Sequence, residues 1–246
     1  MTYSEAAMLL KEHGQEHLLK YYDELDENGK SALLDQISGI NFSDFHALDK
    51  GGERKIGNLT PVPAFTVEEV SRRREEFGSV GLAAIKAGKV AAVLLAGGQG
   101  TRLGSDNPKG MYIMGTSREL SIFACQFANI KQVTDMADAY FHIFVMTSEI
   151  NHDKTVEFFK EKNYFGYPAE KVHFFVQEMA PTCDERGRIF LAEKGKISTS
   201  PNGNGGWYSS LIRGGFGGLL EKEGIEWLNV YSVDNVLQRI CDPVFV

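Results

Sequence analysis

Residues 89–104 read KVAAVLLAGGQGTRLG, an apolar run that passes directly into a glycine-rich segment. The apolar part is a nearly continuous β-capable stretch, which is typical of a strand buried on both faces of a parallel sheet. The glycines that follow permit positive φ angles and let backbone N–H groups converge on an anion without obstruction by side chains. This stretch therefore predicts a sheet with a phosphate-binding loop after its first strand.

Further apolar runs follow the first one, and helical patterns separate several of them. The strands are expected at 141–147, 172–177 and 227–233, and the helices near 119–137, 153–163 and 207–222. This alternation predicts an α/β fold. His142 and His173 lie inside apolar runs and are expected to be core residues. The segment RGGFGG (213–218) puts four glycines into the last helix, so we expect that helix to be short or kinked.

The N-terminal part of the chain has helical character. Apolar spacing over residues 4–25 predicts an amphipathic helix with Ser4 as its cap, residues 26–30 interrupt it, and a second short helix is expected over 32–37. Thr66 with Glu69 has the spacing of a capping box and predicts the start of another helix.

Residues 49–64 are rich in glycine, proline and charge, which predicts an exposed connector. We therefore divide the chain into two parts. They are a small helical N-terminal region with its connector, residues 1–65, and a nucleotide-binding α/β domain, residues 66–246.

Composition excludes several classes of protein. The 246 residues are 43% apolar, which is enough for a sizeable core, and 33 acidic against 26 basic residues give a net charge of −7. Because no basic cluster accompanies this charge, nucleic acid is not an expected partner. The three cysteines stand far apart, which favours neither disulfides nor a zinc site. Without a visible signal peptide or apolar 18-residue run, we expect a cytoplasmic protein that does not enter a membrane.

The glycine-rich loop differs from two familiar phosphate-binding motifs. It lacks the GK[ST] ending of a P-loop, and Leu103 occupies the last glycine position of G-x-G-x-x-G. The alternative to a phosphate cradle is a plain turn between strand and helix. Lys109, between Pro108 and Gly110, follows closely and can direct one ammonium group at phosphate oxygens; the alternative is an ordinary exposed lysine.

Other polar residues follow the later strands. The Gln177 amide matches the adjacent acceptor and donor of a uracil edge, or is only a strand-end polar group. SPNGNGGWY (200–208) brings backbone close to a ligand, or is a long hairpin loop. Asp234 can hold Mg²⁺ against nucleotide phosphates, or belongs to a turn. Because these features are all expected at the carboxyl edge of one sheet, they favour a single nucleotide site.

At these residues the chain resembles the UDP-N-acetylglucosamine pyrophosphorylase family of eukaryotic-type UDP-sugar pyrophosphorylases. Gln99 separates the chain from related UDP-glucose enzymes, whose loops usually carry leucine there. The matching segments are LLAGGQGTRLG (94–104), PKGM (108–111), FFVQEMAP (174–181), IFLAEKGKISTSPNGNGGWY (189–208), GIEWLNVYSVDNVL (224–237) and DPVF (242–245). The resemblance implies a Rossmann-like, glycosyltransferase-A-like fold with a mixed, mainly parallel sheet and flanking helices.

The resemblance also implies a reaction and its residues. UTP and N-acetylglucosamine 1-phosphate would give UDP-N-acetylglucosamine and pyrophosphate. Arg102 and Lys109 would be the catalytic, phosphate-binding residues, and Asp234 would hold Mg²⁺ or Mn²⁺. The substrate-binding residues would be Leu95, Ala96, Gly97, Gly98, Gln99, Gly100 and Thr101 of the loop, Gln177 and Gly203 at uracil, and Asn204 at the sugar.

Members of that family continue well past residue 246, so we expect the α/β domain to be incomplete at its C-terminal end. Two alternative functions remain open. One is a truncated paralogue, catalytically weak or inactive, that binds UTP or a UDP-sugar, and the other is a pyrophosphorylase for a different sugar 1-phosphate. The sequence determines neither the preferred sugar nor the oligomeric state.

Overall fold

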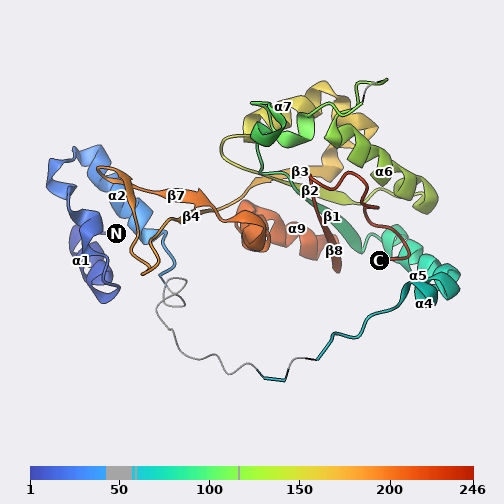
Figure 1. Cartoon of the computed structure of the whole chain (residues 1–246), viewed down its shortest axis with the longest axis horizontal. Coiled ribbons are helices and arrows are strands. Elements are labelled where there is room, and N and C mark those ends of the chain that lie inside the picture. Colours follow the sequence, from blue (N-terminus) through green and yellow to red (C-terminus); the bar gives the residue numbers. More distant parts are fainter. Residues whose placement is uncertain (43–56, 59, 116) are drawn as a thin grey trace. The chain divides into compact units, whose positions relative to one another are not determined.

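The computed structural model describes residues 1–42, 57–58, 60–115 and 117–246, which fall into two compact units (Figure 1). Unit 1 contains residues 1–61 and 179–202, and unit 2 contains residues 62–178 and 203–246. The chain thus leaves unit 2 after Glu178 and returns to it at Gly203. The expected single domain over 66–246 differs from this grouping, because residues 179–202 pack with the N-terminal helices. Most of the expected connector at 49–64 lies outside the described residues.

Unit 1 starts with two capped helices. Thr2 and Glu5 form a reciprocal capping box at α1 (Tyr3–Glu12), so Thr2 and not Ser4 is the cap. The expected helix over 4–25 ends early, at Gly14 with its φ of +65°, and short 3₁₀ turns follow at η1 (Glu16–Leu19) and η2 (Tyr22–Glu24). The Asp26 carboxylate accepts a hydrogen bond from the Gly29 N–H and caps α2 (Glu27–Ser38). Residues 26–30 therefore begin a helix, contrary to the expected interruption.

The second segment of unit 1 is held to these helices by two glutamines. Gln15 donates to the Gly187 carbonyl at 2.9 Å and accepts from the Ile189 N–H at 3.0 Å. Gln36 accepts from the Ile197 N–H at 2.9 Å. The segment forms antiparallel pairs of short strands, namely β4 (Met179–Pro181) with β7 (Thr199–Pro201) and β5 (Leu191–Glu193) with β6 (Lys196–Ile197).

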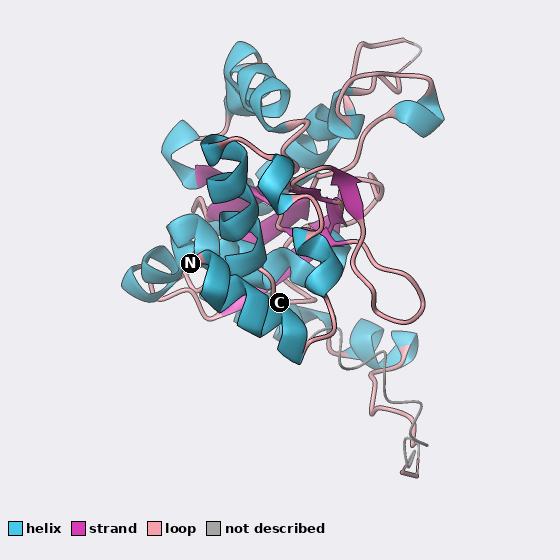
Figure 2. Ribbon diagram, turned by 90° about the vertical axis from the view of Figure 1, so that its left-hand side faces the viewer, coloured by secondary structure: helices cyan, strands magenta, loops and turns pink. Residues whose placement is uncertain are grey.

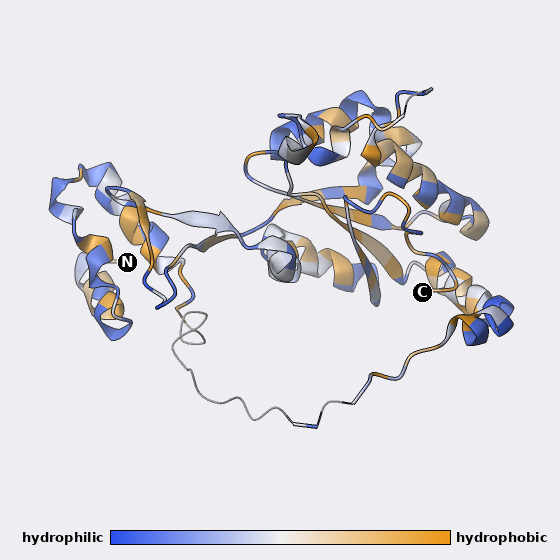
Figure 3. Cartoon of the chain, in the orientation of Figure 1, coloured by the Kyte–Doolittle hydropathy of each residue, from blue (hydrophilic) through white to orange (hydrophobic). Residues whose placement is uncertain are grey.

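Unit 2 is built on a parallel sheet with the strand order β3-β2-β1-β8. Its strands are β1 (Val90–Leu95), β2 (His142–Thr147), β3 (Val172–Val176) and β8 (Trp227–Ser232), each within a residue or so of its expected limits. Every residue of β1 and β2 is buried. The predicted α/β fold is confirmed, and Figure 3 shows the apolar strands in the middle of the unit.

Successive side chains of β1 enter two different cores. Val90, Ala92 and Leu94 pack among residues of α5 (Arg74–Lys86), α6 (Ile122–Ala137) and α7 (His152–Glu161). Ala91, Val93 and Leu95 pack with α8 (Trp207–Leu211) and α9 (Gly217–Lys222) on the other face. Helices therefore cover both faces of the sheet (Figures 1 and 2).

Local sequence signals explain the helix ends of unit 2. Thr66 and Glu69 form the predicted capping box at α4 (Val67–Arg72), and Ser121 caps α6. Between α8 and α9 a π-helical segment, Ile212–Phe216, contains Gly215 at φ +88°, so the predicted kink is confirmed. Within the described residues, no helix combines the length and the apolar character needed to cross a membrane.

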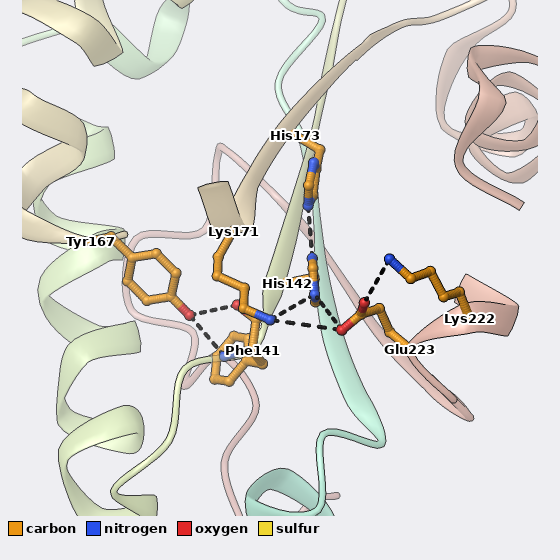
Figure 4. Close-up of polar contacts among 7 residues, drawn as sticks. All are labelled: Phe141, His142, Tyr167, Lys171, His173, Lys222 and Glu223. Carbon is orange, nitrogen blue, oxygen red and sulfur yellow. Dashed lines mark hydrogen bonds and ion pairs between the residues drawn. The ribbon is translucent and has the colours of Figure 1, made fainter. Parts of the chain in front are cut away.

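A polar cluster lies at the amino edge of the sheet (Figure 4). His142 Nδ1 lies 2.7 Å from His173 Nε2, and the Lys171 ammonium lies 2.8 Å from His142 Nε2. Glu223 Oε2 lies 3.5 Å from the same His142 nitrogen and 4.0 Å from the Lys171 ammonium. Lys222 Nζ lies 4.0 Å from Glu223 Oε1. His142 is buried as expected, and His173 is partly buried.

The pKa values of His142 and His173 are both lowered in the folded chain. Burial lowers the pKa of His173 from 6.5 to about 4, with smaller contributions from His142 and Lys171. Burial and the Lys171 charge also lower the pKa of His142, against the opposing effect of Glu223. The folded unit therefore holds these rings neutral at pH values where the unfolded chain protonates them.

We expect the free energy of unfolding to fall as the pH is lowered from 6.5 to 4. In this range the unfolded chain binds more protons than the folded chain, because the pKa of His173 is lowered. His173→Gln should make this slope shallower. Urea unfolding followed by tryptophan fluorescence reports on unit 2 alone, since Trp207 and Trp227 both belong to it. If the free energy of unfolding of His173→Gln depends on pH as steeply as that of the parent chain, the prediction is wrong.

Candidate functional site

The carboxyl ends of the parallel strands bring the predicted site segments to one edge of unit 2. Leu95 is in register with Ser232, and Thr147 with Val176. The glycine loop after β1 and Asp234 after β8 therefore leave neighbouring strands, and Gln177 directly follows β3. The strand order reverses between β1 and β8, and α/β sheets form their ligand crevice at such a switch point.

The glycine loop folds back on the segment that contains Lys109. Gly100 donates to the Asn107 carbonyl at 3.0 Å, and the Lys109 N–H donates to the Gly98 carbonyl at 3.3 Å. The N–H groups of Gly97, Gly98 and Gln99 donate no hydrogen bond within the described part of the chain. Backbone N–H groups without a partner in the protein are available to donate to an anion.

Lys109 and Asp234 form an ion pair across this edge. Lys109 lies at the start of a 3₁₀ turn, η4 (Lys109–Met111), and Asp234 follows β8. The side chains are 23% and 58% exposed, respectively, so both charges remain accessible to a ligand. The two predicted charged residues are therefore brought together, and each neutralises the other.

Close packing fixes the position of this turn. A Cβ atom at Gly110 would lie 2.1 Å from Cζ of Phe123, a fully buried residue of α6. Only glycine fits there, so Phe123 determines how closely η4 approaches the core.

Gln177 lies against the glycine loop. A Cβ atom at Gly97 would come within 2.6 Å of Gln177 Nε2, so the lack of a side chain at Gly97 makes room for the amide. The Gln177 N–H donates to the Thr147 carbonyl at 2.8 Å, which continues the β2–β3 pairing and orients the residue. Gln177 is buried, as is the orphaned Oε1 atom of Gln99, which accepts no hydrogen bond from the described residues.

The other predicted residues have different surroundings. The Leu95 side chain packs in the core, and Thr101 is exposed on η3 (Thr101–Leu103). The side chain of Arg102 lies outside the described part of the structure. Gly203 and Asn204 form the turn η7 (Gly203–Gly206) that leads into α8. The Ser210 hydroxyl of α8 accepts from the Glu178 N–H at 3.0 Å, which ties that helix to the end of β3.

Two buried amides support the site and were missed from the sequence. Asn151, before α7, donates to the carbonyls of Ala96 and Gly98. Gln126 of α6 donates at 3.3 Å to the carbonyls of Ser232 and Val233, next to Asp234. Asn151 and Gln126 lie beside or inside predicted helices, where the sequence pattern alone predicts that a polar residue is a helix cap or a surface group. The contacts that reveal them join segments far apart in the chain.

No group of three or more His, Cys, Asp or Glu side chains is assembled for a metal ion among the described residues. Asp234 alone fits a different kind of site. Mg²⁺ commonly binds through one or two carboxylates, with phosphates and water as its other ligands. The donor set is therefore compatible with Mg²⁺ bound together with a nucleotide.

These features define a Rossmann-like α/β protein with a glycine-rich loop at its topological switch point. The profile described as UTP–glucose-1-phosphate uridylyltransferase matches residues 53–246, and the chain belongs to this family.

The individual proteins that the chain matches are named for UDP-N-acetylglucosamine. The chain is 34% identical to UDP-N-acetylglucosamine diphosphorylase 2 of Arabidopsis thaliana, over 96% of this chain and 51% of that protein. It is 35% identical to the UDP-N-acetylglucosamine pyrophosphorylase of Saccharomyces cerevisiae, with the same two coverages. The inhibitor-bound structure of the Trypanosoma brucei UDP-N-acetylglucosamine pyrophosphorylase superposes with a TM-score of 0.77 at 29% identity, covering 100% of this chain and 54% of that one. The chain thus spans about half the length of these relatives.

We expect Gly110→Ala to lower the free energy of unfolding of unit 2 by roughly 1–3 kcal/mol, the usual cost of overpacking a core. The added methyl group overlaps the buried Phe123 ring, which has no room to move. Gly98→Ala is the matched control, since a Cβ atom there has open space around it. Urea unfolding with tryptophan fluorescence measures both variants, and equal stabilities would show that the Phe123 contact does not constrain η4.

Proposed function

We propose that this protein transfers a uridylyl group from UTP to N-acetylglucosamine 1-phosphate, forming UDP-N-acetylglucosamine and pyrophosphate. The observation that carries this proposal is the set of free N–H groups at Gly97–Gln99 beside Lys109 and Asp234. The family match and the names of the relatives support the uridine nucleotide and the amino sugar. Three free cysteines are compatible with a reducing cytoplasmic location.

The reaction requires two polyanions to meet on a protein with a net charge of −7. The sugar phosphate oxygen attacks the α-phosphorus in line with the departing pyrophosphate, without a covalent enzyme intermediate. The loop N–H groups and the Lys109 ammonium stabilise the phosphate charge, with Arg102 as a further proposed cation. When a phosphate arrives, Lys109 exchanges its Asp234 partner for a phosphate oxygen.

Asp234 is the residue that would hold Mg²⁺ or Mn²⁺. Such an ion supplies charge neutralisation at the phosphates when it is bound. For the base, we propose that the Gln177 amide pairs with the uracil edge beside Gly97, that Gly203 approaches the uracil, and that Asn204 contacts the sugar. Leu95 can contribute through its backbone, because its side chain is in the core.

Two alternatives share this nucleotide site. A pyrophosphorylase for glucose 1-phosphate agrees with the description of the family, although the relatives reported above act in name on N-acetylglucosamine. A chain that binds UTP or a UDP-sugar without turnover agrees with the match to half of each relative. Substrate preference and turnover separate these alternatives from the main proposal.

Calorimetric titration of the 246-residue chain with UTP and Mg²⁺ tests the nucleotide assignment, and ATP is the control. We expect saturable binding of UTP but not of ATP, because the Gln177 amide complements uracil. Pyrophosphate release with N-acetylglucosamine 1-phosphate or glucose 1-phosphate then identifies the sugar. If a folded chain binds neither nucleotide, the nucleotide assignment is wrong for this chain.

We expect Lys109→Ala to lower turnover by about a hundredfold or more, a usual loss when one transition-state donor is removed. Binding of uridine should change much less, since Lys109 contacts phosphate and not the base. Steady-state kinetics and calorimetry with uridine measure the two effects.

Lys89→Ala is the control for this variant. Lys89 also pairs with an acidic residue after a turn, Glu226 at 2.8 Å, but lies at the amino end of β1, away from the site. The Lys89→Ala variant should keep both turnover and uridine binding near the values of the parent chain. Equal losses of turnover and uridine binding in Lys109→Ala would contradict the assigned role.

A further inference from the structure

Asn151 occupies a position where asparagine normally caps a helix. It directly precedes α7, and an N-cap side chain usually accepts a hydrogen bond from the first turn of its helix. Here the side chain makes no such bond, and its Oδ1 atom accepts from the Ser148 N–H at 2.8 Å. The amide Nδ2 atom donates to Ala96 at 3.0 Å and to Gly98 at 3.4 Å. The residue is fully buried, so these bonds are shielded from water.

The direction of these bonds determines where the loop N–H groups point. In a trans peptide the C=O and the following N–H point in opposite directions. Because the Ala96 carbonyl is turned toward Asn151, the Gly97 N–H points away from it. The Gly98 carbonyl, which accepts from both Asn151 and the Lys109 N–H, fixes the direction of the Gln99 N–H in the same manner. Both N–H groups belong to the set that makes no hydrogen bond within the described residues.

The chemistry of the side chain is specific to an amide. The position needs a donor for the two loop carbonyls and an acceptor for the Ser148 N–H, and asparagine supplies both in one planar group. An ionised carboxylate of the same shape would accept from Ser148 but would place negative charge against the carbonyl oxygens of Ala96 and Gly98.

We propose that Asn151 is a positioning residue that orients the peptide groups of the glycine loop, so that the N–H groups of Gly97 and Gln99 face the phosphates of the bound nucleotide. This inference rests on the proposed function, because the ligand is the nucleotide assigned there. Asn151 acts through the backbone of the loop and does not itself contact the ligand.

Asn151→Asp tests this role through its pH dependence. The new carboxyl group is buried beside two carbonyl oxygens, so its pKa is raised, and its protonated form regains a donor for Ala96. Relative to the parent chain at the same pH, we expect the variant to bind UTP with Mg²⁺ roughly tenfold or more weakly at pH 8. At pH 6 the difference should shrink to about threefold or less. Taking the ratio at each pH removes the titration of UTP itself.

Asn229→Asp is the matched control. Asn229 is also buried, and its Oδ1 accepts a backbone N–H, that of Cys241 at 2.8 Å, but it lies within β8 and not at the loop. The ratio of UTP affinity between Asn229→Asp and the parent chain should stay constant with pH. Tryptophan fluorescence confirms that unit 2 is folded in each variant. A constant ratio for Asn151→Asp, or unchanged UTP binding, would overturn the proposal.

A second measurement separates this proposal from the proposed function. If the parent chain does not bind UTP, the proposed function fails, and the ¹⁵N–¹H amide resonances of Gly97 and Gln99 decide the role of Asn151. Changes in these resonances in Asn151→Asp at pH 8, reversed toward pH 6, support the orientation of the loop by Asn151. Resonances that match the parent chain at both pH values refute it.

Discussion

The parallel pairing of β1 with β2 on one side and β8 on the other is the constraint on which the site depends. It brings three strand ends to one edge, although the residues that follow them are widely separated in the sequence. The register is strongly determined, because alternate residues of β1 enter different cores and a one-residue slip would exchange them. The apolar packing of β1 thus fixes where the glycine loop begins and where Asp234 stands opposite it.

At the proposed site, unpaired backbone N–H groups take the place of a cluster of basic side chains. Backbone N–H groups carry fixed partial charges and lose no side-chain entropy when an anion binds. The one described lysine at the loop is neutralised by Asp234, so no isolated charge is left against the core. The side-chain amides of Asn151 and Gln126 are buried, which is unfavourable for polar groups unless they are hydrogen-bonded. Both donate to backbone carbonyls and so orient those peptide groups. This arrangement would allow an acidic protein to bind phosphates at the proposed site.

Strands and helix caps were predictable where the signal is local, as in the apolar run of β1 and the capping box of Thr66 and Glu69. The sequence also placed Lys109, Asp234 and Gln177 at one edge of the sheet, because parallel strands share a carboxyl edge; in the structure Lys109 pairs with Asp234, and Gln177 lies against Gly97. It failed where a long-range contact decides the outcome. Gln15 and Gln36 bind residues 172 and 161 positions away, respectively, and draw the segment 179–202 into unit 1. Asn151 has the local pattern of a cap, and only the folded chain shows that its amide donates to the Ala96 carbonyl instead of capping α7.

Unit 1 is made of two chain segments, and this limits the order in which the units can fold while the chain is being synthesised. Its helices emerge from the ribosome before residues 179–202, yet their core includes Ile189 and Ile197. Leu10 and Leu33 therefore lack part of their apolar partners until β1, β2 and β3 have all been made. Unit 1 therefore cannot finish folding before these three strands have been made, although part of it precedes them in the chain, and this departs from the usual folding of domains in chain order. Until residue 197 appears, its apolar surface remains open to solvent or to a chaperone.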